Sequence, residues 1–327
     1  MVNYLLRRVL GLIPLLFGIT LVCFLIIHLT PGDPTMGGTE LNPKVSLEAR
    51  QRMRAFYGLN DPLPIQYARW LKCVVTLDFG RSLIDNRPVR QRIAERIPIT
   101  LAINVLSLLL IFLIAVPIGV AAAAKPHSLF DQGTTFLAFL GFSMPTFWLA
   151  LLCMRWFGVH LQWLPVSGLH SLGVEQWSWW ERWADLGRHL ALPVGVSAFG
   201  GVAGIARYMR GSVDEVLQQD YIRTARAKGL PERAVLFDHA LRNALLPIIT
   251  IVGLSVPGLL GGSVIFETIY AIPGLGRLYY DAVMARDLMT VMGLLTISAV
   301  LTLLGNLLAD IAYACADPRI RVSGRSS

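Results

Sequence analysis

The sequence has little charge for its length. Only 15% of its 327 residues are Asp, Glu, Lys or Arg, whereas 54% are hydrophobic, and the mean hydropathy is +0.57. A soluble globular protein carries about 25% charged residues. This deficit excludes an ordinary soluble protein and predicts that much of the chain faces lipid. The net charge of +8 would also suit nucleic acid, but the hydrophobicity favours a membrane and no nucleic-acid partner.

The motifs of common catalytic sites are also absent from the sequence. None of the four lysines follows a glycine, which excludes a G-x-x-x-x-G-K-S/T phosphate-binding loop. No histidine precedes a glutamate, so an H-E-x-x-H zinc site is excluded, and there is no G-x-S-x-G nucleophile elbow. The four cysteines form no disulfide framework. We therefore expect a chain that is not an enzyme, with no catalytic residue, metal site or cofactor of its own.

Long apolar runs are what the sequence has instead. Six of them approach or exceed the length needed to cross a hydrocarbon core of about 30 Å: residues 9–29, 99–124, 134–157, 190–206, 247–269 and 289–313. The first run follows Arg7 and Arg8, but it is too long for a signal peptide and no small-x-small cleavage site follows it. We predict an all-α integral membrane protein with six transmembrane helices.

The distribution of Lys and Arg predicts the orientation of these helices. Outside the long segment 30–98, most basic residues fall in the N-terminal end, the segment 207–246 and the C-terminal tail, so these are expected in the cytoplasm. Segment 30–98 is also basic, but loops above about 60 residues are translocated largely regardless of charge. The predicted parts are a transmembrane helix (1–29), an extracytoplasmic subdomain (30–98) with helices near 46–57 and 65–75, a core of five transmembrane helices (99–313) and a cytoplasmic tail (314–327).

The centres of the six runs contain no ionisable residue. Ion-coupled carriers usually place an acid, a base or a broken-helix ion site at mid-depth. A transport function would therefore draw its energy from elsewhere, and an ion-coupled secondary carrier is the alternative of a different class. Polar positions within or beside the runs are candidates to line a pathway, or simply to bond helix to helix: Asn104, Ser143, Ser255, Ser263 and Glu267. Glu267 could pair with Arg277 or gate the outer mouth.

Small residues and tryptophans mark two further features. Gly200–Gly204 and Gly258–Gly262 fit G-x-x-x-G, which favours close helix packing, within the bundle or at a subunit interface. Five tryptophans crowd the predicted outside loop, as an interfacial aromatic belt or a docking face for an external partner: Trp163, Trp177, Trp179, Trp180 and Trp183.

The polar segment 207–246 carries the clearest local pattern. Ser212 with Glu215 three residues later fits a capping box at a helix start. Gly229 is a natural left-handed residue at a helix end, and Pro231 suits the start of the next helix, which is expected to reach about residue 246. The product is a basic helix–Gly–Pro–helix unit on the cytoplasmic side.

The order of residues in this segment resembles the EAA loop of ABC importer permeases, in the version of the dipeptide/oligopeptide/nickel permease family. It runs from Asp220-Tyr221-Ile222-Arg223-Thr224-Ala225-Arg226-Ala227-Lys228-Gly229 to His239-Ala240-Leu241-Arg242-Asn243-Ala244. Other matches, in order along almost the whole chain, are Pro31-Gly32-Asp33-Pro34, Tyr57-Gly58-Leu59-Asn60-Asp61-Pro62-Leu63, Asp78-Phe79-Gly80-Arg81-Ser82, Glu267-Thr268-Ile269, Pro273-Gly274-Leu275-Gly276-Arg277 and Asp317-Pro318-Arg319-Ile320-Arg321.

Three departures accompany the resemblance. Arg223-Thr224-Ala225 stands where the general pattern has Glu-Ala-Ala. Arg242 stands where that pattern has Pro, which is similar to the first of the two permeases of such systems. Leu288-Met289 follows Arg286-Asp287 where the family often has Tyr-Pro, which weakens any transfer of function to that outside loop.

The resemblance implies a permease subunit of an ATP-driven, binding-protein-dependent importer in the bacterial inner membrane, with a type I permease core. It implies a second homologous permease, two cytoplasmic ATPase subunits that bind ATP and Mg²⁺, and an external substrate-binding protein. Short peptides are the expected substrate, with nickel, metal–opine complexes, glutathione or oligosaccharides as alternatives. The implied coupling helix lies near residues 224–230, and the implied ATPase-coupling residues are Arg223, Thr224, Ala225, Arg226, Ala227, Lys228, Gly229, Leu230, His239, Leu241 and Arg242.

Overall fold

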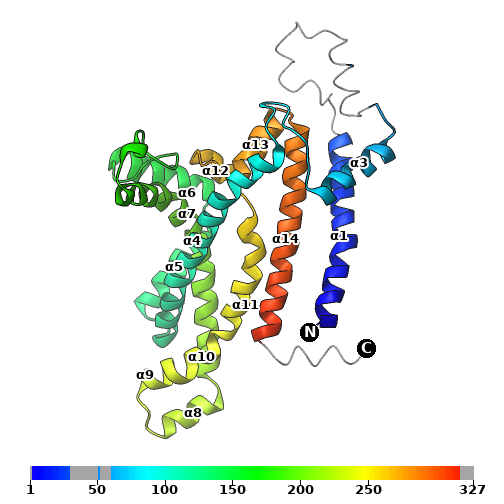
Figure 1. Cartoon of the computed structure of the whole chain (residues 1–327). Helices are drawn as coiled ribbons and strands as arrows, with labels where there is room; N and C mark the ends of the chain where they lie inside the picture. Colours follow the sequence, from blue (N-terminus) through cyan, green and yellow to red (C-terminus); the bar gives the residue numbers. More distant parts are fainter. Residues whose placement is uncertain (1, 30–50, 52–59, 317–327) are drawn as a thin grey trace. The chain divides into compact units, whose positions relative to one another are not determined.

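The computed structural model describes residues 2–29, 51 and 60–316, and it is built from helices (Figure 1). Within these residues there is no β-strand, only an isolated bridge between Arg81 and Pro88. The predicted all-α class is therefore confirmed. The predicted helix near 46–57 and the motifs at 31–34, 57–63 and 317–321 lie wholly or partly outside the described residues.

The chain divides into two compact units. One comprises Met1–Thr100, Val256–Thr268 and Pro273–Ser327, and the other comprises Leu101–Ser255 and Ile269–Ile272. The predicted domain boundaries at residues 29, 98 and 313 stay predictions.

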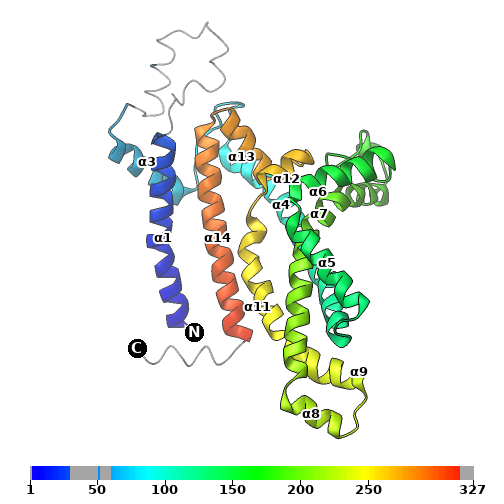
Figure 2. The same cartoon turned by 180° about the vertical axis from the view of Figure 1, so that it is seen from behind.

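The first unit contains two long helices that lie side by side, α1 (Val2–Leu29) and α14 (Leu288–Ala316), as Figures 1 and 2 both show. The shorter helices α3 (Leu63–Thr76), α12 (Val264–Ile269) and α13 (Leu275–Met284) and the first part of α4 (Val89–Ala124), up to Thr100, complete it. Its core is a cluster of buried apolar side chains: Phe24, Trp70, Val74, Phe79, Val89, Ile93, Leu275, Leu278, Met292 and Leu294. Helix α3 confirms the helix predicted near 65–75.

The second unit is organised around α7 (Trp179–Leu217), a 39-residue helix about 58 Å long. The C-terminal part of α4 (Val89–Ala124) and α5 (Leu129–Ser143) pack against it. A Cβ at Gly119 would lie 2.6 Å from the Ala206 carbonyl oxygen, so glycine there permits the close approach of α4 to α7. The remaining helices of this unit are α6 (Thr146–Cys153), α8 (Asp220–Ala227), α9 (Glu232–Ala234), α10 (Leu241–Ala244) and α11 (Leu246–Ser255).

Four helical stretches of the described chain are long and apolar enough to cross a membrane: Val89–Ala124, Trp179–Leu217, Glu232–Leu259 and Leu288–Ala309. A fifth is possible if the bent pair Leu129–Ser143 and Thr146–His160 forms one span. The described apolar part of α1, Leu10–Leu25, is shorter than the others. A multi-pass helical membrane protein is confirmed, with four or five candidate spans rather than the expected six.

The third expected span, 134–157, is not one straight helix. It bends by 104° between α5 and α6. Met144 is extended (φ −89°, ψ 126°), because the ring of Pro145 disfavours the helical conformation for the residue before it. After α6 the chain continues as a π-helix, Met154–His160.

The fifth expected span, 247–269, is also interrupted. Helix α11 ends at Ser255, a 3-10 helix follows at Val256–Leu260, and α12 is separate. Gly258 and Gly262 therefore do not share an α-helix, and their role in helix packing or at a subunit interface stays a prediction. Gly262 still has a close-approach role, because a Cβ there would lie 2.4 Å from the backbone nitrogen of Gly276.

Candidate functional site

The segment 207–246 begins as an unbroken continuation of the apolar part of α7. Its first residues, from Arg207 to Leu217, extend α7 by about 16 Å beyond the predicted span end at residue 206. The predicted capping box at Ser212 was wrong, because Ser212 lies inside α7. Its hydroxyl instead donates to the Ala244 carbonyl oxygen (3.0 Å), which ties α7 to α10.

Beyond α7 the chain folds into a helical hairpin, residues 220–244, which Figure 1 shows at the end of the second unit. Its first arm is α8, and its second arm runs from α9 through a π-helix, Val235–Ala240, into α10. A small core joins the arms: Ile222 and Ala225 of α8 are buried against Val235 and Ala240. This core gives the hairpin its own packing, independent of any partner.

The turn between the arms depends on Gly229. Its φ is +77°, in the left-handed region that glycine adopts without the steric cost of a Cβ. The Gly229 N–H donates to the Arg226 carbonyl (2.9 Å), which closes the end of α8. Pro231 then precedes α9 with φ −66°. The sequence prediction for this turn is confirmed.

The exposed face of α8 and its turn presents most of the residues that the family resemblance singles out: Arg223, Thr224, Arg226, Ala227, Lys228, Gly229 and Leu230. Ala225 is different, since it is buried in the hairpin and packs the arms together. On the second arm His239 and Arg242 are exposed, whereas Leu241 is half-buried beside the core around Met209 and Val213.

Arg226 is engaged within the hairpin. Its Nε and one terminal nitrogen donate to the two carboxylate oxygens of Glu232, at 2.9 and 3.2 Å. This bidentate pair spans the Gly229 turn and braces the two arms. Lys228 and Arg242 make no ion pair with the acidic groups that the structure describes. The unpaired positive charge of the hairpin therefore rests on these two side chains and on the exposed Arg233 of α9, more than on Arg226.

Two polar contacts support the base of the hairpin. The Asn243 amide donates to the Tyr221 hydroxyl (2.7 Å), linking its arms a second time. In α7, the Arg210 guanidinium forms a bidentate pair with the buried carboxylate of Asp131, one bond of which measures 2.8 Å. The second contact joins the end of α7 to the first turn of α5, so the hairpin is attached to a rigid base.

The candidate pathway residues are divided between the two units. Asn104, Ser143 and Ser255 belong to the second unit, and Ser263 and Glu267 to the first. The Ser255 hydroxyl donates to the Ile251 carbonyl of its own helix (2.8 Å), and the Ser263 hydroxyl accepts the Phe266 N–H (3.4 Å). Asn104 is half-buried and Ser143 is exposed at the end of α5. Gly200 and Gly204 face Gly141 and Phe142 of α5.

Glu267 is buried and holds the start of α13. Its carboxylate accepts the Thr100 hydroxyl (3.1 Å) and the backbone N–H of Arg277 (2.9 Å). The contact with Arg277 is therefore through the backbone, and the Arg277 guanidinium lies 4.0 Å from Asp281. A Cβ at Gly274 would lie 2.4 Å from the Glu267 carboxylate, which explains a glycine at that point of the Pro273–Arg277 motif.

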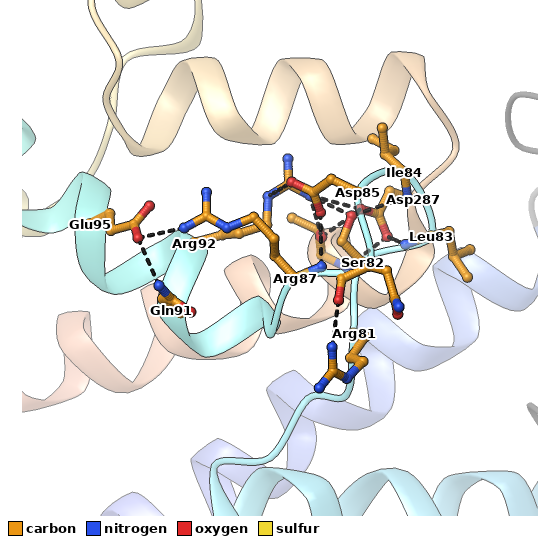
Figure 3. Close-up of polar contacts among 12 residues, drawn as sticks. Arg81, Ser82, Leu83, Ile84, Asp85, Arg87, Gln91, Arg92, Glu95 and Asp287 are labelled. Carbon is orange, nitrogen blue, oxygen red and sulfur yellow. Dashed lines mark hydrogen bonds and ion pairs between the residues drawn. The ribbon is translucent and has the colours of Figure 1, made fainter.

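A buried polar network that the sequence did not predict lies in the first unit (Figure 3). Asp287 is fully buried and accepts the Ser82 hydroxyl (2.5 Å), the Arg92 guanidinium (3.1 Å) and the Thr290 hydroxyl (2.6 Å). It joins the loop before α4 to the start of α14. The motif Asp78–Ser82 and the pair Arg286-Asp287 were visible as separate signals, but nothing in the sequence connected them.

Asp85 lies beside the same network, within 3.5 Å of Arg92 (Figure 3). Burial alone would raise the pKa of the Asp85 carboxyl. The backbone N–H of Arg87 and the charge of Arg92 outweigh that effect, so its pKa lies below the usual value.

Comparison with known proteins places this architecture among transport proteins. Residues 115–322 match the family "binding-protein-dependent transport system inner membrane component", and residues 1–104 match the N-terminal region of such membrane components. The chain is 45% identical over 321 residues to the oligopeptide transport system permease protein AppB of Bacillus subtilis (strain 168), covering 98% of this chain and 99% of that protein.

Two further relatives also match over nearly their full length. The dipeptide transport system permease protein DppB of Alkalihalophilus pseudofirmus is 37% identical over 337 residues, covering 98% of this chain and 100% of that protein. A putative peptide transport system permease protein of Brucella abortus (strain 2308) is 39% identical over 323 residues, covering 98% and 99%.

Proposed function

The chain belongs to the family of binding-protein-dependent transport system inner membrane components, and on that basis we propose that it is a permease subunit of an ATP-driven importer of short peptides. It is a multi-pass protein of the bacterial inner membrane and a transport subunit, not an enzyme. The observation that carries the proposal is the hairpin 220–244, whose basic exposed face stands at the end of the long helix α7.

The hairpin would act as the contact with an ATPase subunit. Its core of Ile222, Ala225, Val235 and Ala240 makes it rigid, and the Arg210–Asp131 pair fixes its base to α5. A force applied to α8 would therefore move α7 and the start of α5 together. When ATP brings two ATPase subunits together, such a lever would shift the bundle between inward-open and outward-open states.

The charge on the hairpin fits a partner surface with acidic groups. Lys228 and Arg242 are exposed and make no ion pair with described residues, so they are available for contacts across an interface. The Arg223 side chain is also largely exposed (74%), and its guanidinium lies 3.6 Å from the exposed carboxylate of Asp220. It is therefore also accessible to a partner. Arg226 would contribute indirectly, because its pair with Glu232 braces the turn.

The remaining organisation follows from the family. We propose six spans with both termini in the cytoplasm. Four are the helices that are long and apolar enough to cross a membrane, and α1 and the bent pair α5–α6 would be the other two. The segment 30–98 would form an extracytoplasmic subdomain. A second homologous permease would complete the pathway, and two ATPase subunits would bind ATP and Mg²⁺.

Short peptides are the proposed substrate because the relatives are named as oligopeptide, dipeptide or peptide permeases. Nickel, metal–opine complexes, glutathione and oligosaccharides are the alternatives handled by similar machinery. Substrate choice in such systems resides largely in the external binding protein. Asn104, Ser143, Ser255, Ser263 and Glu267 are proposed as positions beside the pathway, with Glu267 acting through its hold on α13.

Reconstitution tests the proposal. The complete complex in proteoliposomes, with binding protein outside and ATP inside, should accumulate a labelled dipeptide. Omission of either ATP or the binding protein should abolish uptake. Uptake that is driven by an ion gradient without the ATPase subunits would overturn the proposal in favour of a secondary carrier.

A further inference from the structure

An apolar groove of about 740 Å³ lies in the second unit, where the end of α4, the start of α5 and the second arm of the hairpin meet. Its apolar lining includes Val116, Val120 and Ala121 of α4, Phe130 of α5, and Leu236 and Phe237 of the π-helix. Phe130 and Phe237 are 50% and 55% exposed. A contiguous exposed apolar patch that is rimmed by polar residues marks a contact with a membrane, a ligand or another protein.

Two cations lie at the same groove. Lys125 directly follows the last residue of α4, and Arg233 lies in α9. Both side chains are exposed, and neither forms an ion pair with the acidic groups of the described residues. The groove therefore combines an apolar wall with two unneutralised positive charges, which is the complement of an amphipathic anion.

The position of the groove indicates where such an anion would come from. The apolar helix α4 ends at Ala124, and Lys125 marks its passage into a polar environment. Lys and Arg at the end of a transmembrane helix lie at the headgroup level of the cytoplasmic leaflet, which is rich in anionic lipid. Under the proposed orientation, the groove opens at that level.

We propose that this groove binds an anionic phospholipid of the inner leaflet. Its acyl chain would lie against the apolar wall, and its phosphate would contact Lys125 and Arg233. A bound lipid would link α4, α5 and the second arm of the hairpin, and so support the base of the coupling element. The proposal rests on the orientation proposed above, but it does not require that peptides are the substrate.

Native mass spectrometry of the complete, delipidated complex provides the test. The complex is incubated with equal amounts of phosphatidylglycerol and phosphatidylcholine that carry the same acyl chains, and the retained lipids are counted. The double variant Lys125→Gln/Arg233→Gln should lower the preference for phosphatidylglycerol about tenfold or more, because each cation near the surface contributes to anion attraction. Ala121→Phe should lower retention of phosphatidylglycerol by filling the groove while it leaves both charges in place.

Arg207→Gln is the matched control, since it removes one exposed cation of the second unit that does not line the groove. Its lipid preference should equal that of the unmodified complex. Equal retention of the two lipids, or an equal loss in Arg207→Gln, would overturn the proposal.

A second measurement separates a lipid from a protein occupant. A photoreactive label at Phe237→Cys should react with lipid in the assembled complex, and reaction with an ATPase subunit would also overturn the proposal. Because lipid retention is measured without transport, a complex that retains the lipid but fails to import peptides would refute the proposed function alone.

Discussion

Variants of the Arg226–Glu232 pair can distinguish two roles of Arg226, namely bracing the hairpin from within and contacting a partner subunit. Arg226→Glu removes the bidentate pair and places two carboxylates across the Gly229 turn. The exchanged double variant, Arg226→Glu/Glu232→Arg, restores an ion pair within the hairpin but inverts the charge that faces a partner. If Arg226 acts by bracing, the exchange should recover uptake that the single variant loses.

The size of the effect follows from the exposure of the two side chains. They are 41% and 72% exposed, so solvent screens the pair and its contribution is about 0.5–1 kcal/mol. Replacing attraction by repulsion of similar size makes the loss in the single variant about 1–2 kcal/mol. At about 1.4 kcal/mol per tenfold, the equilibrium ratio of closed to open hairpin falls about 5- to 30-fold.

Uptake of a labelled dipeptide is the assay, in cells that lack their own copy of this permease, with the amount of membrane protein measured by immunoblot. The single variant should lose most uptake at an unchanged protein level, and the exchanged variant should recover more than half of it. Arg223→Glu is the comparison, because Arg223 makes only one 3.6 Å contact and does not brace the turn. No recovery in the exchanged variant would refute the bracing role and assign Arg226 to the partner interface.

Three other predictions concern the first unit. Asp287→Ala should lower the free energy of unfolding by about 3–5 kcal/mol, because it removes the buried carboxylate of an ion pair and leaves Arg92 only its 3.5 Å contact with the more exposed Asp85. Thermal unfolding in detergent measures this loss. Gly274→Ala should cost about 1–3 kcal/mol, since the new methyl group would overlap the Glu267 carboxylate, and the same assay applies. The depressed pKa of Asp85 contributes stability above the unfolded pKa that is lost as pH falls through the folded pKa, so Asp85→Asn should reduce the acid-induced drop in melting temperature.

Matched controls distinguish these effects from general damage. Asp281→Ala removes a 56% exposed acid, and it should leave the melting temperature nearly unchanged. A Cβ at Gly211, in the interior of α7, meets nothing within 4 Å, so Gly211→Ala should be neutral or stabilising. A melting temperature for Asp287→Ala or Gly274→Ala that matches its control would contradict the stated cause. So would an unchanged acid sensitivity in Asp85→Asn.

Local features with strong conformational demands were predictable from the sequence. Gly229 and Pro231 predicted the turn of the hairpin. Glycine adopts a left-handed φ more readily than other residues, and the fixed φ of proline suits the start of a helix. The helix at Leu63–Thr76 was predicted from apolar residues at helical spacing. The exposed face of α8 followed from the family resemblance rather than from charge alone.

Features decided by distant contacts were not predictable. Pro117 and Pro193 lie in helices that continue, whereas Pro145 accompanies a 104° bend, so proline alone does not locate the break. Ser212 has the sequence of a cap, but its hydroxyl finds the Ala244 carbonyl and the helix continues. Asp287 and Ser82 are separated by 205 residues, and only the fold brings them together.

Site-specific crosslinking tests whether α8 contacts an ATPase subunit. A single cysteine at Thr224, on the exposed face of α8, is introduced into the complete complex after the native cysteines are replaced. Leu172→Cys is the control, because Leu172 is fully exposed but precedes α7, at the other end of that helix from the hairpin. We expect crosslinks from Thr224→Cys to an ATPase subunit, with a yield that changes when ATP binds, and none from Leu172→Cys. Absence of crosslinks from Thr224→Cys in a complex that hydrolyses ATP and imports peptide would refute the proposed contact of α8 with the ATPase.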